Sequence, residues 1–120
     1  MNVFCEQIDT CTVVKVEGDI VVPETDQLKE FLLERIDGGR HDLILDFTTV
    51  PYMDSSAISV LLTLLQAARR HGGDVRLVGI NDRISELFEQ VGLQHIFRLF
   101  EGRKEAIASF QEASRPEIAG

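Results

Sequence analysis

Tryptophan is absent from this chain of 120 residues, and cysteine and proline are scarce, with two and three residues. The two cysteines, Cys5 and Cys11, form no disulfide framework, and no cysteine or histidine cluster has the spacing of a metal site. Disulfides are rare in the reducing cytosol, so we expect free thiols there. The scarcity of these residues predicts a cytoplasmic protein that binds no metal and is not cross-linked.

Long apolar segments and clustered positive charge are also missing. The longest apolar stretch is interrupted by Ser59, Thr63 and Gln66 and falls short of the ~20 residues that span a membrane. The N-terminal residues do not have the pattern of a signal peptide. The net charge is −8, and no basic cluster is present to neutralise phosphates. We therefore expect neither membrane insertion nor nucleic-acid binding.

The usual catalytic and cofactor motifs are absent as well. There is no glycine-rich phosphate loop, and no serine is flanked by glycines as in a nucleophile elbow. A triad of Ser56 and Asp54 with His41, His71 or His95 can be drawn, but small domains often offer such a trio by chance. We expect no enzyme and no cofactor, and a small hydrolase that uses Ser56 is the weakest of the alternatives.

What is present is the pattern of one α/β domain. The apolar fraction is 44% and the charged fraction 27%, as in ordinary globular proteins. Alternating and continuous apolar runs predict strands, i, i+3, i+4 spacing predicts helices, and glycines follow several helices. The expected order is strands at 3–8 and 12–18 in a hairpin, helix 24–36, strand 43–47, helix 55–71, strand 75–80, a helix capped by Asn81 or Asp82, an edge strand at 96–100 and helix 103–111. We expect a mixed sheet of four to five strands with about four helices packed on it.

The start of the helix at 55–71 is the most informative place in the chain. Asp54, Ser55 and Ser56 lie where a helix has unpaired N–H groups and the positive end of its dipole. Such residues form helix caps, and the same position also favours a phosphate group. We expect Asp54 or Ser55 to cap the helix and Ser56 to act as a switch.

The body of this helix is apolar on nearly every side. Its polar positions form only a narrow stripe, at Ser59, Thr63, Gln66 and Arg70. Such a helix is either buried almost all round or offers apolar surface to a partner. We expect Val60 and Thr63 to lie near its exposed edge and to take part in partner binding.

These features resemble a known family. A strand ending in Leu-Asp-Phe, a short loop and Tyr-Met-Asp-Ser-Ser opening an apolar helix resemble the STAS domain and, more narrowly, the bacterial anti-sigma factor antagonists. The likeness extends over about residues 3–112, including Val-Glu-Gly-Asp-Ile at 16–20 and Ile-Ser-Glu-Leu-Phe at 84–88. It implies a STAS domain at 1–112, followed by a flexible tail at 113–120.

The resemblance implies a partner-switching protein of transcription regulation. Its partner is an anti-sigma factor that is also a serine kinase, and phosphorylation of the second serine of the motif, here Ser56, releases that partner. A phosphatase, for example one of the PP2C type, resets the switch. The implied partner-binding residues are Asp19, Asp54, Ser55, Ser56, Ala57, Val60 and Thr63.

Two positions depart from the family pattern. Ala57 follows the serine pair where the family usually has glycine, and Val21 replaces a frequent aspartate. Alanine suits a helix interior, but its methyl group could crowd a kinase that approaches closely. Both departures favour the alternative of a STAS subunit with a constitutive scaffold role, in a stressosome or a lipid-transport complex, where Ser56 is only a cap.

Overall fold

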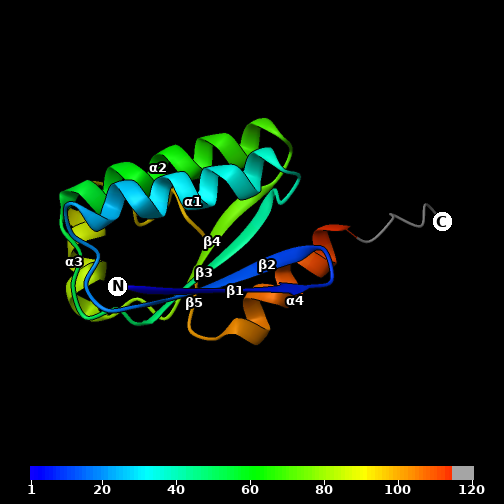
Figure 1. The fold of residues 1–120 in the computed structure, drawn as a ribbon. Helices are drawn as coiled ribbons and strands as arrows, with labels where there is room; N and C mark the ends of the chain where they lie inside the picture. The colour runs from blue at the N-terminus through cyan, green and yellow to red at the C-terminus, as the bar shows by residue number, and fades with distance from the viewer. Residues whose placement is uncertain (115–120) are drawn as a thin grey trace.

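The computed structural model describes residues 1–114, with side chains up to residue 111 (Figure 1). Its elements are β1 (Asn2–Ile8), β2 (Cys11–Glu17), α1 (Glu24–Asp37), β3 (Asp42–Thr49), α2 (Ser55–Arg70), β4 (Asp74–Val78), α3 (Asp82–Gln90), β5 (Leu99–Phe100) and α4 (Arg103–Ser114). α4 includes the first two residues of the tail expected at 113–120, and the rest of that segment lies outside the described residues.

The strands form one mixed sheet in the order β1-β2-β3-β4-β5. β1 and β2 are an antiparallel hairpin, whereas β2, β3, β4 and β5 run parallel to one another. The α/β class is confirmed, at the upper end of the expected strand number and with four helices among residues 1–114. The edge strand expected at 96–100 is only two residues long.

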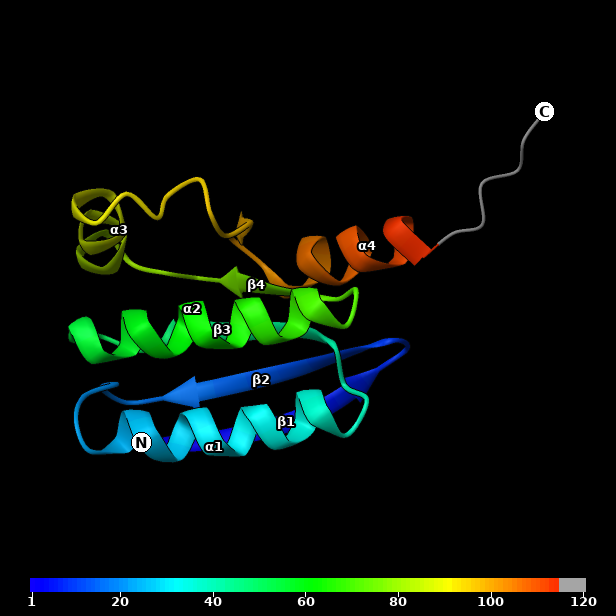
Figure 2. The ribbon, with the colours of Figure 1, turned by 90° about the horizontal axis from the view of Figure 1, so that it is seen from above.

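Helices cover both faces of the sheet unequally. α1 and α2 lie side by side over one face, α3 lies at one end of that layer, and α4 packs on the opposite face (Figures 1 and 2). The larger core lies under α1 and α2, where alternate residues of the central strands point; these include Val14, Val16, Leu43, Leu45, Phe47, Val75 and Leu77. A smaller core joins Ile44 and Val78 to Ala106 and Phe110 of α4.

The apolar surface of α2 is covered by the domain itself. Eight of its residues are buried, and the expected polar stripe at Ser59, Gln66 and Arg70 faces solvent. Of the two possibilities for an apolar helix, this chain therefore adopts the one in which it is buried on most sides. No helix among residues 1–114 has both the length and the apolar character required to cross a membrane.

The two cysteines do not face each other across the hairpin. Cys5 lies opposite Val14, and Cys11 lies opposite Ile8 beside the turn. Both thiols are free, with Cys5 exposed and Cys11 buried. Burial, with the nearby carboxylates of Asp42 and Asp9, raises the pKa of the Cys11 thiol, which keeps it protonated.

The loops after β2 and β3 lie against each other at the carboxyl ends of these parallel strands. The N–H of Ile20 donates to the carbonyl of Tyr52 (3.0 Å), and the N–H of Asp54 donates to the carbonyl of Ile20 (3.2 Å). Ile20 and Met53 also form an isolated parallel bridge. The carboxyl ends of neighbouring parallel strands lie side by side, so the β2–α1 loop and the start of α2 become neighbours despite ~30 intervening residues.

Candidate functional site

Asp54 caps α2 and ties it to the β2–α1 loop. Its backbone is extended (φ −95°, ψ 179°), and its Oδ1 accepts from the N–H of Ser56 (2.9 Å) and from the hydroxyl of Ser56. Its Oδ2 accepts from the N–H of Val22 at 3.2 Å. Of the two residues expected to hold the helix start, Asp54 provides the side-chain cap. One carboxylate thus joins the helix N-terminus to a loop 32 residues earlier.

Ser56 is half-buried between the two loops and the first turn of α1. Besides its bond to Asp54, its Oγ lies 3.1 Å from Oγ1 of the buried Thr25. Ser55 precedes it and is exposed. The serine pair is therefore divided, with Ser55 open to solvent and the Ser56 hydroxyl held inside a small polar cluster.

The hydrogen bonds around Asp54 keep it charged. The Ser56 hydroxyl is the largest influence, and together with the N–H groups of Val22, Ser56 and Ala57 it outweighs the opposing effect of desolvation. These bonds hold the pKa of Asp54 below its ordinary value. The negative charge of the cap is thus present at neutral pH, immediately beside the Ser56 oxygen.

Two of the expected partner-binding residues are buried. Ala57 is 1% exposed and Val60 is 5% exposed, and both belong to the main core. The expectation that Val60 lies at an exposed edge is wrong, because α1 and the sheet cover that side of α2. The methyl group of Ala57 likewise points into the core, not toward an approaching kinase. Thr63 is half-buried, and its hydroxyl donates to the carbonyl of Ser59 (3.0 Å).

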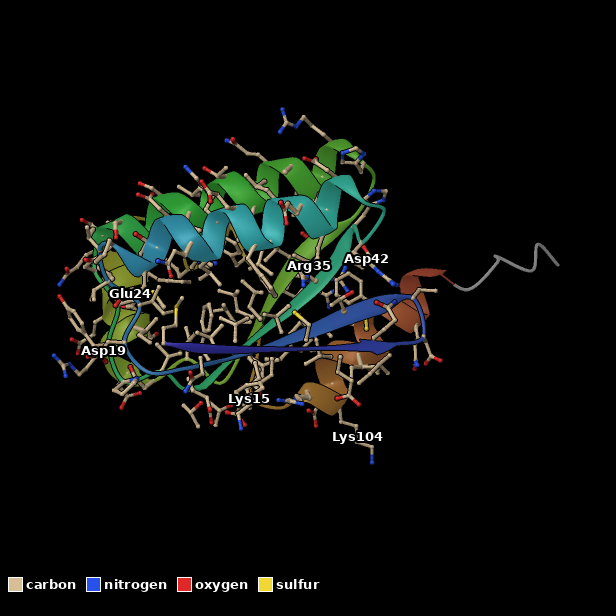
Figure 3. All side chains as sticks on the ribbon, viewed as in Figure 1. Lys15, Asp19, Glu24, Arg35, Asp42 and Lys104 are labelled. Atoms are coloured by element: carbon tan, nitrogen blue, oxygen red, sulfur yellow. The ribbon has the colours of Figure 1, made fainter. Side chains whose placement is uncertain are left out.

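The exposed groups at this end form what we call the switch-end surface, made of Asp19, Val22, Tyr52, Ser55 and Arg83. Asp19 is exposed and lies at the same end of the molecule as the start of α1, marked by Glu24 in Figure 3. Val22 is 63% exposed and Tyr52 41% exposed. Large exposed apolar side chains grouped among polar ones are typical of protein-binding surfaces.

A pocket of about 240 Å³ lies beside Ser55, between the loop before α2 and α3. Its lining comprises Tyr52, Met53, Asp54, Ser55, Arg83, Ile84, Glu86, Leu87 and Gln90. The Arg83 guanidinium lies 5.4 Å from the centre of the Tyr52 ring, a cation–π arrangement. The side-chain amide of Asn81 donates hydrogen bonds to the carbonyls of Val50 and Pro51, which fixes α3 against this loop.

The sequence predicted no binding or positioning role for Thr25, Val22, Tyr52 or Arg83. Their signal is topological: the loops after neighbouring parallel strands converge, so residues of the β2–α1 and β3–α2 loops are neighbours although they are distant in the sequence. Val21 is half-buried, and its carbonyl accepts from the N–H of Thr25 (3.3 Å).

Two of the three histidines lie far from Ser56. His41 and His71 stack on each other, with ring centres 4.4 Å apart, and His71 is the C-cap of α2. This is the helix end opposite Ser56, so neither ring completes a triad with Ser56 and Asp54. In the part of the chain with described side chains, no group of three or more potential metal ligands comes together.

Comparisons with known proteins agree with the resemblance. The STAS domain family model matches residues 3–106. The anti-sigma-B factor antagonist of Staphylococcus epidermidis is 31% identical over 104 residues, which cover 85% of this chain and 96% of that protein.

Solved structures share the fold at lower identity. The unphosphorylated form of the anti-sigma factor antagonist SpoIIAA aligns with a TM-score of 0.82 and 18% identity, over 92% of this chain and 97% of that one. The phosphorylated form of Bacillus SpoIIAA aligns with a TM-score of 0.74 and 19% identity, over 91% and 99%. The family match spans most of the chain and agrees with the fold and the Asp-Ser-Ser helix start, and this protein therefore belongs to the STAS domain family.

Proposed function

We propose that this protein is an anti-sigma factor antagonist that binds an anti-sigma factor through its switch-end surface and is controlled by phosphorylation of Ser56. The observation that carries the proposal is the position of Ser56. Its hydroxyl lies in the first turn of α2, is half-buried and is bonded to the cap that joins α2 to the β2–α1 loop. The similarity to a staphylococcal anti-sigma-B factor antagonist supports the same assignment.

A phosphate on Ser56 would alter this surface without unfolding the domain. The anion gains from the helix dipole and lies beside the N–H of Ser56, for which it competes with the Asp54 carboxylate. Transfer of the γ-phosphoryl group of ATP to Oγ releases ADP and the hydroxyl proton, and thereby removes the donor that Asp54 accepts from. The phosphate also adds almost two negative charges beside the charged Asp54.

The repulsion would act on the link between the two loops. Asp54 also accepts from the N–H of Val22, and the exposed Val22 side chain belongs to the switch-end surface. Displacing the carboxylate therefore moves or releases the β2–α1 loop. Combined with the cost of burying a phosphate in an interface, this change weakens the docking of the anti-sigma factor.

A constitutive docking subunit is the second candidate function. The half-buried Ser56 hydroxyl already completes the helix cap, as a purely structural serine would. In that case the same surface binds its partner permanently, and charge at Ser56 has no regulatory effect. The two candidates differ in whether Ser56 is modified and in whether that modification changes affinity.

The test uses the purified protein with an anti-sigma factor kinase from the same organism, Mg²⁺ and ATP, followed by mass spectrometric mapping of phosphate. We expect phosphate on Ser56. Affinity of the kinase for the Ser56→Ala variant should be retained, whereas Ser56→Asp should weaken binding at least about tenfold, or ~1.4 kcal/mol.

Ser59→Asp is the matched control, because Ser59 is an exposed serine about one turn further along α2. It adds the same charge without touching the Asp54 cap and should leave affinity nearly unchanged. Far-ultraviolet circular dichroism should be the same for all variants. The proposal fails if Ser56 stays unmodified and Ser56→Asp binds as tightly as the wild type.

A further inference from the structure

β1 forms a long open edge of the sheet. It pairs with β2 over seven residues in continuous register, and its other side faces no strand among residues 1–114 (Figure 2). It contains no proline, lysine or bulge, which are the usual means of protecting an edge from pairing with another chain. The opposite edge, β5, has only two residues. The unprotected edge is therefore a site for adding another strand.

A large aromatic side chain lies exposed on this edge. Phe4 is 55% exposed and lies opposite Lys15 of β2. Lys15 lies on the face of the sheet turned away from α1 and α2 (Figure 3), and Phe4 shares that face because opposed residues of an antiparallel pair point the same way. An open cavity of about 510 Å³ borders it, lined by Phe4, Cys5, Glu6, Val13, Lys15 and Arg103. The surface beside the edge thus combines an aromatic ring with Glu6 and two cations, of which Lys15 pairs with Glu17 at 3.5 Å and Arg103 pairs with Asp46.

We propose that β1 pairs antiparallel with β1 of a second copy of this chain, forming a symmetric dimer with one continuous ten-stranded sheet. About half of the N–H and C=O groups of an edge strand point outward, and antiparallel pairing with a copy satisfies them on both chains. The interface is self-complementary, as a two-fold axis requires. It is independent of the proposed switch at Ser56.

The side chains select one register. Residues that face each other across a symmetric pair must lie on the same face, so the axis passes beside a single residue of β1. An axis at Glu6 places two carboxylates opposite each other, which is destabilising. An axis at Phe4 pairs only five strand residues. An axis at Cys5 pairs all seven residues of β1 and has no like charges opposite.

The Cys5 register also covers the exposed ring of Phe4. It places Glu6 of each copy opposite Phe4 of the other, on the face that carries Lys15 and Arg103. The Glu6 side chain of the copy therefore lies beside Phe4, which loses water contact, and beside two cations that already pair with Glu17 and Asp46 of their own chain. On the other face, the exposure of Cys5 shows that α1 leaves the edge open there.

Sedimentation velocity over a wide concentration range, at physiological ionic strength, tests the dimer. The interface is small, so we expect reversible dimerisation that is weak. Phe4→Lys should raise the dissociation constant at least about tenfold, because it removes the aromatic contact and protects the edge. Val91→Lys changes another exposed apolar residue, at the end of α3, and should leave the dissociation constant unchanged.

Disulfide formation tests the register. Opposed residues of an antiparallel pair have Cα atoms roughly 4.5–5.5 Å apart, within the range of a disulfide. Diamide, which takes two electrons and two protons from a pair of thiols, should convert the wild type to a Cys5–Cys5 dimer. Cys11→Ser should still cross-link, and Cys5→Ser should not, because Cys11 is buried.

A cysteine placed away from the two-fold axis distinguishes cross-linking in the proposed register from cross-linking by random collision. In the Cys5→Ser background, Gln7→Cys places an exposed thiol two residues from the axis, roughly 14 Å from its copy. It should cross-link poorly alone but well when mixed with a Cys5→Ser, Val3→Cys chain. A protein that stays monomeric at all concentrations overturns the proposal, as does equal cross-linking through positions 5 and 7.

Discussion

At the scale of single residues, Asp54 performs several tasks with one carboxylate. It caps α2, holds the Ser56 hydroxyl and binds the N–H of Val22. In the proposed mechanism a phosphate on Ser56 competes with these bonds, so the residue that stabilises the helix start also transmits the modification to the neighbouring loop. The proposal therefore assigns both a structural and a regulatory role to Asp54.

The charge of Asp54 should make stability depend on pH. Its pKa is lowered in the folded state, chiefly by the Ser56 hydroxyl, so its contribution is present above the unfolded value of ~3.9 and is lost as pH falls through the folded pKa. Asp54→Asn keeps a side-chain cap but removes the charge. Urea unfolding between about pH 6 and pH 3 should show wild type and variant converging at acid pH.

Asp46 has a lowered pKa in both proteins and adds the same background to each curve. The free-energy difference between wild type and Asp54→Asn therefore isolates Asp54. A difference that stays constant across this pH range would show that the charge of Asp54 does not contribute to stability.

At the scale of elements, α2 is at once a core helix and the carrier of the site. Its first turn presents Ser55 and Ser56 at the molecular end, whereas Ala57 and Val60 anchor the same turns in the core. A partner that docks at the helix start therefore meets a rigid surface. Where the family resemblance implied a glycine, this chain has Ala57, whose side chain packs inward.

Ala57→Gly should consequently affect stability and leave modification unchanged. We expect a loss of about 1 kcal/mol in the free energy of unfolding, from lower helix propensity and from the missing buried methyl group. Ser56 phosphorylation rates should match the wild type, because the methyl group lies inside the core. Ala108→Gly, on the exposed side of α4, is a control for helix propensity alone. A markedly faster modification of Ala57→Gly would show that the methyl group does obstruct the kinase.

At the scale of the whole molecule, a few polar contacts attach α4 to the second face of the sheet. Arg103 Nε donates to Oδ2 of the buried Asp46 at 2.5 Å, while the N–H and hydroxyl of Thr48 bind the other carboxylate oxygen. Burial alone raises the pKa of Asp46, but the bonds from Thr48 and Arg103 outweigh it and lower the pKa overall. This ion pair connects the start of α4 to β3.

Removing the Arg103 side chain should weaken that attachment. Arg103→Ala leaves the Asp46 carboxylate buried with only the Thr48 bonds, and we expect a loss of about 1–3 kcal/mol in urea unfolding. Lys104→Ala is the matched control, because Lys104 is the next residue in the chain and its side chain extends into solvent (Figure 3). Equal effects of the two substitutions would mean that the ion pair contributes nothing beyond an exposed charge.

Local signals in the sequence were enough to predict the α/β class, the order of the elements and the Asp54–Ser56 helix start. These depend on nearby residues: the spacing of apolar side chains, a cap two residues before Ser56, and glycine after a helix. The Asn81 cap of α3 could be predicted for the same reason, and its side chain accepts from the N–H of Ile84. The observed ends of the helices and strands differ from the predicted ends by a few residues, because the end of a strand depends on its pairing partner.

The surroundings of Ser56, the proposed switch, were decided by tertiary structure alone. Ser56 meets Thr25 and Asp54 meets Val22 across about thirty residues, because the ends of parallel strands converge, and no local pattern encodes that contact. Packing of α2 against α1 buried Val60, which helical periodicity had placed at an edge. The sequence by itself determined where the proposed switch lies in the chain. The assembled sheet and helices determined which side chains surround it, because burial depends on contacts between distant segments.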